Sequence, residues 1–243
     1  MTELEAYYND VLIFYGKIAI VFLWIPVIVA WVKWKHLNRP LKVFHWYLMA
    51  IILNNLLAQL VLWTFRKDYE SFWKPYLTAW KIDNIHFLNI IYDLIVLIFV
   101  GYFYYILLKK IQASNWLKYL ICFLCLVAII NHLFIDGFRS FGIINSTITG
   151  IFVTFLPCLY LWHLNKAEPG ISLSKNPYFM ISLGLFVPSL ISLIYLFLGD
   201  EIYKHDFVLF VKFQMVKNLI DVISQGFFIV AFWNARFVRF LDR

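Results

Sequence analysis

Charged residues are scarce in this sequence of 243 residues: Asp, Glu, Lys and Arg together make up 14% of the chain. A typical soluble domain has roughly 25%. Hydrophobic residues account for 63% and aromatic residues for 21%. A soluble chain of this composition would expose large apolar patches and aggregate. The scarcity of charge therefore excludes an ordinary soluble domain, and the absence of any long polar stretch leaves no room for a second, soluble one.

The residues and motifs of most catalytic and disulfide-bonded proteins are also missing. The three cysteines, Cys122, Cys125 and Cys158, all fall within apolar runs, where cysteine usually acts as a small hydrophobic residue. The sequence has no H-E-x-x-H motif, no G-x-S-x-G motif and no close group of carboxylates. We therefore expect no enzymatic activity, no metal and no cofactor. No signal-peptide cleavage pattern is visible, so we expect the first apolar run to be retained as a helix.

What the sequence does contain is long apolar runs. A helix needs about 20 mostly apolar residues to cross a bilayer. Seven runs meet this requirement, at 11–32, 43–64, 85–108, 117–135, 141–163, 178–198 and 207–232. They predict an all-α polytopic membrane protein: one transmembrane domain over residues 1–243, built as a bundle of seven helices.

The distribution of charge between the runs predicts an orientation. The basic residues are concentrated in the loops on one side, which include Lys33, Lys35, Arg39 and Lys42. Because such loops stay in the cytoplasm, we expect the N-terminus outside and the C-terminus inside. The longest loop lies on the outer side and has aromatic residues at helical spacing, which predicts an interfacial helix at 66–82. The basic charge indicates topology, and we expect no nucleic-acid partner.

The last apolar run contains polar residues in an ordered pattern. At about 100° per residue, six of them fall within an arc of about 120°. They are Gln214, Lys217, Asn218, Asp221, Ser224 and Gln225. Because Lys217 and Asp221 are four residues apart, they can pair. We therefore predict one polar stripe on this helix.

Other polar residues belong to the outer halves of the remaining runs. His86, Asn89 and Asp93 lie on one side of the third run, within about 60° of each other. An ionisable residue as deep as Asp93 is expected to face the protein interior or a wet cavity. We therefore predict a polar ligand pocket that opens to the outside. Its candidate binding residues are Lys17, Asn55, His86, Asn89, Asp93, Asn131, His132, Lys217, Asn218, Asp221 and Gln225.

Other interpretations of these residues stay open. The amides and hydroxyls could join the helices by hydrogen bonds alone, with no ligand. His86 and His132 near one face, with His45 and His163 near the other, could hold two b-type haems in an electron carrier. Lys217 could form a retinal-type Schiff base with an acid as counter-ion. Buried charges in a seven-helix protein also suit a secondary transporter of a small solute.

Taken as a whole, the chain resembles a loosely defined family of small bacterial seven-helix membrane proteins of unassigned function, often encoded beside two-component sensor kinases. The stretches that carry the resemblance are GYFYYILLKK at 101–110, KNPYFMISLGLF at 175–186 and the last run ending in AFWNARF. The resemblance implies a sensor or signalling accessory protein of the bacterial inner membrane, with a sensor kinase or another membrane protein as its partner. We expect its ligand to be a small molecule or a lipid headgroup.

Overall fold

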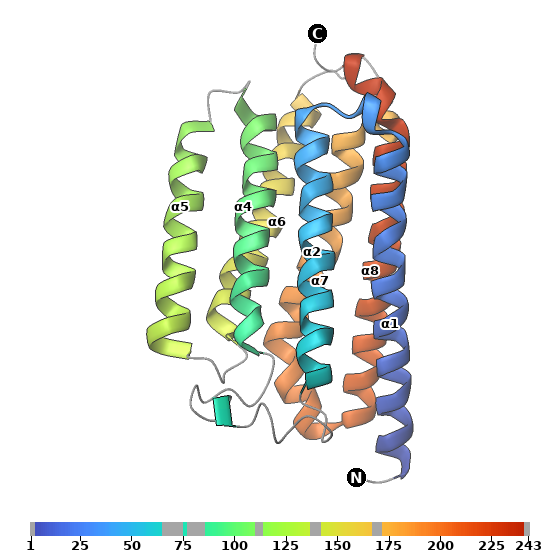
Figure 1. Ribbon diagram of the computed structural model, residues 1–243, viewed down its shortest axis with the longest axis vertical. Coiled ribbons are helices and arrows are strands. Elements are labelled where there is room, and N and C mark those ends of the chain that lie inside the picture. Colours follow the sequence, from blue (N-terminus) through green and yellow to red (C-terminus); the bar gives the residue numbers. More distant parts are fainter. Residues whose placement is uncertain are drawn as a thin grey trace. The chain divides into compact units, whose positions relative to one another are not determined.

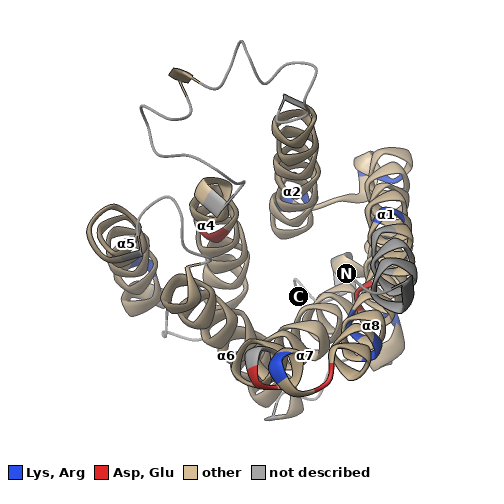
Figure 2. Cartoon of the chain, turned by 90° about the horizontal axis from the view of Figure 1, so that it is seen from below, with Lys and Arg blue, Asp and Glu red and all other residues tan. Residues whose placement is uncertain are grey.

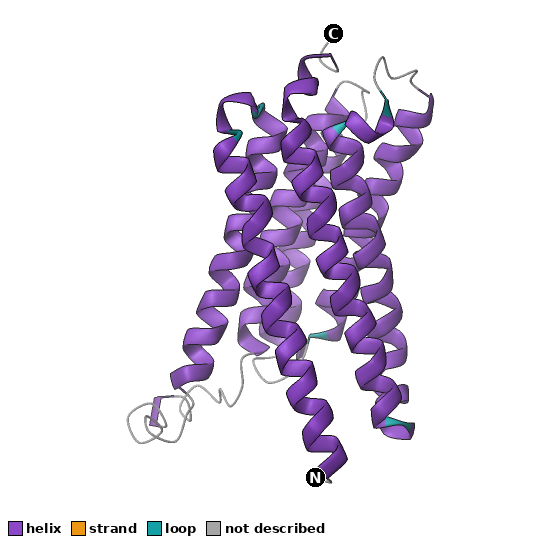
Figure 3. Cartoon of the chain, turned by 90° about the vertical axis from the view of Figure 1, so that its right-hand side faces the viewer, coloured by secondary structure: helices purple, strands orange, loops and turns teal. Residues whose placement is uncertain are grey.

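The computed structural model describes residues 3–64, 75–76, 86–109, 114–136, 142–166 and 172–240. Within these residues every regular element is a helix, and no strand is present (Figure 3). Seven of the described helices are long and apolar enough to cross a membrane. The prediction of an all-α polytopic membrane protein is therefore confirmed.

The helices match the predicted apolar runs closely (Figure 1). The seven long ones are α1 (Glu3–Val32), α2 (Arg39–Thr64), α4 (Asn89–Leu108), α5 (Ser114–Asn131), α6 (Ile143–Lys166), α7 (Pro177–His205) and α8 (Phe207–Trp233). Short helical turns flank them: η1 (Trp34–His36), η2 (His86–Leu88), η4 (His132–Asp136), η5 (Leu173–Lys175) and η6 (Asn234–Phe240). The predicted interfacial helix at 66–82 lies outside the described residues, apart from Pro75 and Tyr76.

The chain divides into two compact units. One contains Met1–His45 and Gly150–Arg243, and the other contains Trp46–Thr149. We call them the α1/α7/α8 unit and the α4/α5 unit. That the chain is a single domain, and that the N-terminus lies outside, stay predictions.

In the α1/α7/α8 unit, helix α8 packs against both α1 and α7. The ammonium of Lys33, just after α1, lies 4.2 Å from the ring centre of Trp233 at the end of α8. These two helices therefore run in the same direction. Helix α7 begins with a well-formed cap, because the Asn176 side chain accepts hydrogen bonds from the backbone of Tyr178 and Phe179. At its other end, Asp206 accepts from the backbone of Leu209 and starts α8 after a very short turn.

In the α4/α5 unit, helix α4 packs against α5. The inner face of α4 is apolar and fully buried at Leu97, Val100 and Phe103. Helix α5 ends at Asn131 and continues into the π-helical turn η4. Such turns interrupt the regular backbone ladder and occur often at functional positions.

Many large apolar side chains on the long helices are exposed. On α8 exposed apolar side chains recur at intervals of three, four and seven residues, at Val216, Leu219, Ile223 and Val230. The helices carry few charged residues along their lengths (Figure 2). Exposed apolar stripes of this kind are stable only in a bilayer, since lipid solvates them and water does not.

Candidate functional site

The polar residues of α8 form a stripe on the side of the helix opposite its exposed apolar residues. Gln214, Lys217, Asn218 and Asp221 are all half-buried. At about 100° per residue, the centre of this stripe lies about 180° from that of the exposed apolar stripe through Val216. The predicted polar stripe is therefore observed, on the side of α8 opposite its exposed apolar residues. Lys212, predicted to lie on the opposite side, is exposed.

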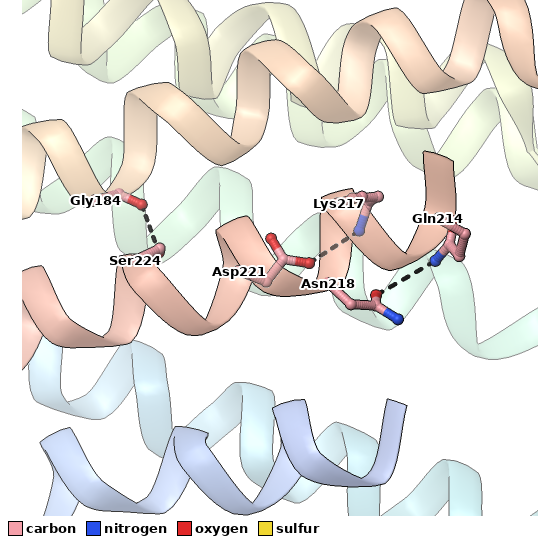
Figure 4. A network of polar contacts seen from close by, with 6 residues as sticks. All are labelled: Gly184, Gln214, Lys217, Asn218, Asp221 and Ser224. Atoms are coloured by element: carbon pink, nitrogen blue, oxygen red, sulfur yellow. Dashed lines mark hydrogen bonds and ion pairs between the residues drawn. The ribbon is translucent and has the colours of Figure 1, made fainter. Parts of the chain in front are cut away.

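Two pairs of side chains along the stripe are joined by contacts (Figure 4). The Lys217 ammonium donates to the Asp221 carboxylate at 3.0 Å, and the two side chains keep 22% and 32% of their surface exposed. The Gln214 amide donates to Asn218 at 3.4 Å. Opposite charges four residues apart stabilise a helix. In this position part of each charged group also remains open to a third group.

The stripe continues into a hydrogen bond with α7 that compensates for a proline. Proline has no backbone N–H, so Pro188 cannot donate to the carbonyl of Gly184 one turn earlier. The Ser224 hydroxyl, which is 5% exposed, donates to this carbonyl at 2.8 Å. A backbone carbonyl without a donor is costly inside a membrane. Ser224 therefore holds α8 against the interrupted turn of α7.

Glycine makes this contact possible. A Cβ atom added at Gly184 would lie 2.5 Å from Cε1 of Phe228 and 3.2 Å from Cβ of Phe227. Only a residue without a side chain lets the two helices approach this closely. A second close approach joins α6 to α7, where a Cβ at Gly150 would lie 2.6 Å from the Leu193 side chain. Helix α7 is thus held tightly on both sides around Pro188.

A second polar cluster lies in the α4/α5 unit, which we call the amide cluster. It consists of four buried residues with 2–5% exposure: Asp93, Asn131, Asn145 and Thr149. The Asn131 amide donates to Asn145 at 3.0 Å, and the Asn145 amide donates to the carbonyl of Ala128 at 3.0 Å. The Asp93 side chain interacts with the Thr149 hydroxyl. These contacts bring together the start of α4, the end of α5 and the start of α6.

The remaining predicted site residues are Lys17, Asn55, His86, Asn89 and Gln225. Lys17 is exposed on the same side of α1 as Val21 and Ile28, and no described contact joins it to Asp93 or Asp221. Asn55, Asn89 and Gln225 are half-buried. The side chain of His86 lies outside the described residues. Within the α1/α7/α8 unit, Lys17 is therefore not part of the polar stripe of α8.

Two of the four histidines considered for haem are packed among other side chains. His45 is fully buried. The centre of its ring lies 5.9 Å from that of Trp31, 5.3 Å from Trp34 and 6.5 Å from Phe232. His132, which follows Asn131 in the sequence, is buried at 4% exposure. Edge-to-face packing of this kind stabilises a core, so the observed surroundings of His45 favour a structural role.

Sequence reasoning missed the pairing of Ser224 with the Gly184 carbonyl. The position of Pro188 could have revealed it. Because proline has no N–H, the carbonyl four residues earlier, that of Gly184, has no helical donor. Asn145 and Thr149 were expected only as polar residues in the outer half of a span, and they were not among the candidate binding residues.

Comparisons with models of protein families, with curated proteins and with solved structures found no match to this chain. The resemblance to small bacterial seven-helix proteins therefore stays a prediction. What the observations establish is an integral membrane protein of seven apolar helices, and within the described residues each of the two units has polar side chains in its spans.

Proposed function

We propose that this protein is a membrane sensor module, without enzymatic activity, in which the polar stripe of α8 binds a small molecule or a lipid headgroup. The observation that carries the proposal is the half-exposed Lys217–Asp221 pair on the side of α8 opposite its lipid-facing stripe. Charge inside a membrane is costly and is usually kept for function. If the two side chains served only to neutralise each other's charge, two apolar residues could take their place without loss of stability.

The chemistry of the stripe favours a ligand that carries both signs of charge. The Lys217 ammonium can bind a carboxylate or phosphate, and the Asp221 carboxylate can bind an ammonium. The amides of Gln214 and Asn218 add donors and acceptors one turn away. A zwitterion, either a free one or the phosphoethanolamine headgroup of a lipid, satisfies both charged groups at once.

Ligand binding would reach the rest of the unit through α7. Asp221 is three residues from Ser224, whose hydroxyl supports the turn interrupted by Pro188. A ligand that separates Lys217 from Asp221 would shift this part of α8 and alter the Ser224 contact. Two packings of α7 against α8 that differ by a few kcal/mol are the kind of element that a ligand can switch.

The signal would leave through η6, the short helix after α8. Its first residue, Asn234, donates to the carbonyl of Ser174 at 3.2 Å, and Lys175 lies over the Phe237 ring at 5.6 Å. These contacts tie the end of α8 to the turn that precedes α7. A partner such as a sensor kinase, bound at η6 in the bacterial inner membrane, would respond to a movement of either helix.

Ligand binding is tested by thermal unfolding of the purified full-length protein. The probes are glycerophosphoethanolamine, which is zwitterionic, and glycerol phosphate, which is anionic only. We expect the zwitterion to raise the midpoint temperature. The double variant Lys217→Gln/Asp221→Asn should lose this response. Lys212→Gln is the matched control, because Lys212 is exposed on the opposite side of the same helix. A response that survives in the double variant would remove the stripe from consideration.

The rival function is secondary transport. The observation that favours it is Asp93, a second acid within a span, which is 2% exposed. Transporters use such residues to couple solute movement to a cation or proton. Uptake of labelled glycerophosphoethanolamine into proteoliposomes, abolished by Asp93→Asn, would favour transport. Co-purification of a kinase without uptake would favour the sensor.

A further inference from the structure

We propose that one end of the α1/α7/α8 unit binds the headgroup of an anionic phospholipid from the bilayer around it. At this end α1 and α8 finish and α2 and α7 begin. Basic side chains from all of these segments gather here, and we call them the basic end: Lys33, Lys35, Lys42, Lys175 and Arg236. The proposal does not depend on the ligand of the polar stripe, because Lys217 lies about four turns of α8 before the end of that helix.

Contacts with aromatic rings bring these segments together although they are far apart in the sequence. The Lys33 ammonium lies 4.2 Å from the ring centre of Trp233, which joins the end of α1 to the end of α8. The charged groups of Lys175 and Arg236 lie 5.6 and 4.9 Å from the ring centre of Phe237, which joins η5 to η6. The basic end is therefore one surface of the folded unit.

The described segments that build the basic end contain no acidic residue to balance its charge. Residues 30–45, 172–180 and 228–240 have no Asp or Glu. Elsewhere in this unit, Asp206 starts α8 at the opposite end, and Asp221 is paired within that helix. An aromatic ring attracts a cation and leaves its charge in place. These segments therefore carry a net positive charge that an anionic partner can neutralise.

Exposed apolar side chains beside the basic end favour a lipid over a soluble anion. Trp31 and Trp233 are both exposed, and tryptophan is enriched at the level of the lipid headgroups. Ile28 and Val32 on α1 and Val230 on α8 are exposed as well. A phospholipid with its phosphate at the lysines has its acyl chains along these residues. Clusters of Lys and Arg at the ends of membrane spans recognise anionic headgroups in this way.

The test is the thermal unfolding of the full-length protein in nonionic detergent micelles, followed by tryptophan fluorescence. Dioleoyl phosphatidylglycerol, which is anionic, is compared with dioleoyl phosphatidylcholine, which has no net charge. The response is the difference between the two midpoint temperatures, and we expect the anionic lipid to give the higher one, with saturation. Lys33→Gln/Lys42→Gln should raise the half-saturating mole fraction of the anionic lipid about thirtyfold, which corresponds to about 1 kcal/mol for each charge.

Two control variants separate this site from a general effect of charge. Lys204→Gln/Lys212→Gln removes the same charge near the opposite end of the same unit, from two exposed side chains, and should respond as the wild type does. Lys33→Arg/Lys42→Arg should keep the response, because arginine retains the charge. If the glutamine variant of the basic end does not unfold cooperatively, Lys175→Gln decides, with an expected shift of about fivefold.

Glycerol phosphate distinguishes the lipid from a free anion, because it carries the phosphate without acyl chains. At the same concentration we expect it to leave the midpoint temperature unchanged. Equal midpoints in the two lipids would overturn the proposal. So would an equal loss of response in the control pair at the opposite end, or stabilisation by glycerol phosphate as strong as that by the anionic lipid.

Discussion

Replacing Ser224 by alanine removes the hydroxyl that compensates for Pro188. The Gly184 carbonyl then has no donor from its own helix and none from α8. Hydrogen bonds between membrane helices average about 0.6 kcal/mol and reach about 1.7. Because this one satisfies a carbonyl with no alternative donor, we expect a loss near the upper end, about 1.5 kcal/mol in the free energy of unfolding.

The cause can be isolated with a double-mutant cycle. In a Pro188→Ala background, residue 188 regains its N–H and can donate to Gly184 within the helix. Ser224→Ala should then cost only about 0.5 kcal/mol, so the coupling between the two positions is about 1 kcal/mol. The measurement is unfolding in mixed detergent micelles, followed by tryptophan fluorescence. Ser192→Ala is a control on α7, because Ser192 is not part of the contact between Ser224 and the Gly184 carbonyl. Equal costs in both backgrounds would refute the reasoning.

Three further predictions use the same unfolding assay. Gly184→Ala should destabilise by about 1–3 kcal/mol, because its Cβ would lie 2.5 Å from the Phe228 ring; adding Phe228→Leu should recover part of the loss, and no recovery would contradict the close approach. Lys217→Gln and Asp221→Asn should each cost about 1–2 kcal/mol, since each leaves one charge unpaired, whereas the double variant should cost less than their sum; strict additivity would disprove the pairing. Asn145→Ala loses both hydrogen bonds that join α5 and α6 and should cost about 2 kcal/mol; a neutral effect would show that these bonds do not hold the amide cluster.

The helices could be predicted from the sequence because each depends on a local property. The length of an apolar run determines whether it spans a bilayer. The polar stripe of α8 could be predicted for the same reason, because the 100° step of a helix fixes which side chains share a side. The Lys217–Asp221 pair could be predicted because residues four apart on a helix are neighbours and these two carry opposite charges.

Other parts of the candidate sites depend on tertiary packing, which the sequence does not specify locally. Ser224 and Gly184 are separated by 40 residues, and only the packing of α7 on α8 brings them together. Lys17 was expected to face inward because it is charged, yet its side chain is exposed on the apolar side of α1. A lysine near the end of a span can extend its long side chain to the membrane surface, so charge alone does not indicate an inward direction.

The most direct test of the central claim, that the polar stripe of α8 faces a wet interior and not lipid, is thiol labelling of two neighbouring positions. In a variant whose native cysteines Cys122, Cys125 and Cys158 are replaced by alanine, Asn218→Cys and Leu219→Cys are each treated in membranes with a water-soluble maleimide. We predict that position 218 reacts, because it lies on the polar stripe, and that position 219 does not, because Leu219 is 56% exposed on the lipid-facing stripe. Labelling of position 219 without labelling of position 218 would contradict the account.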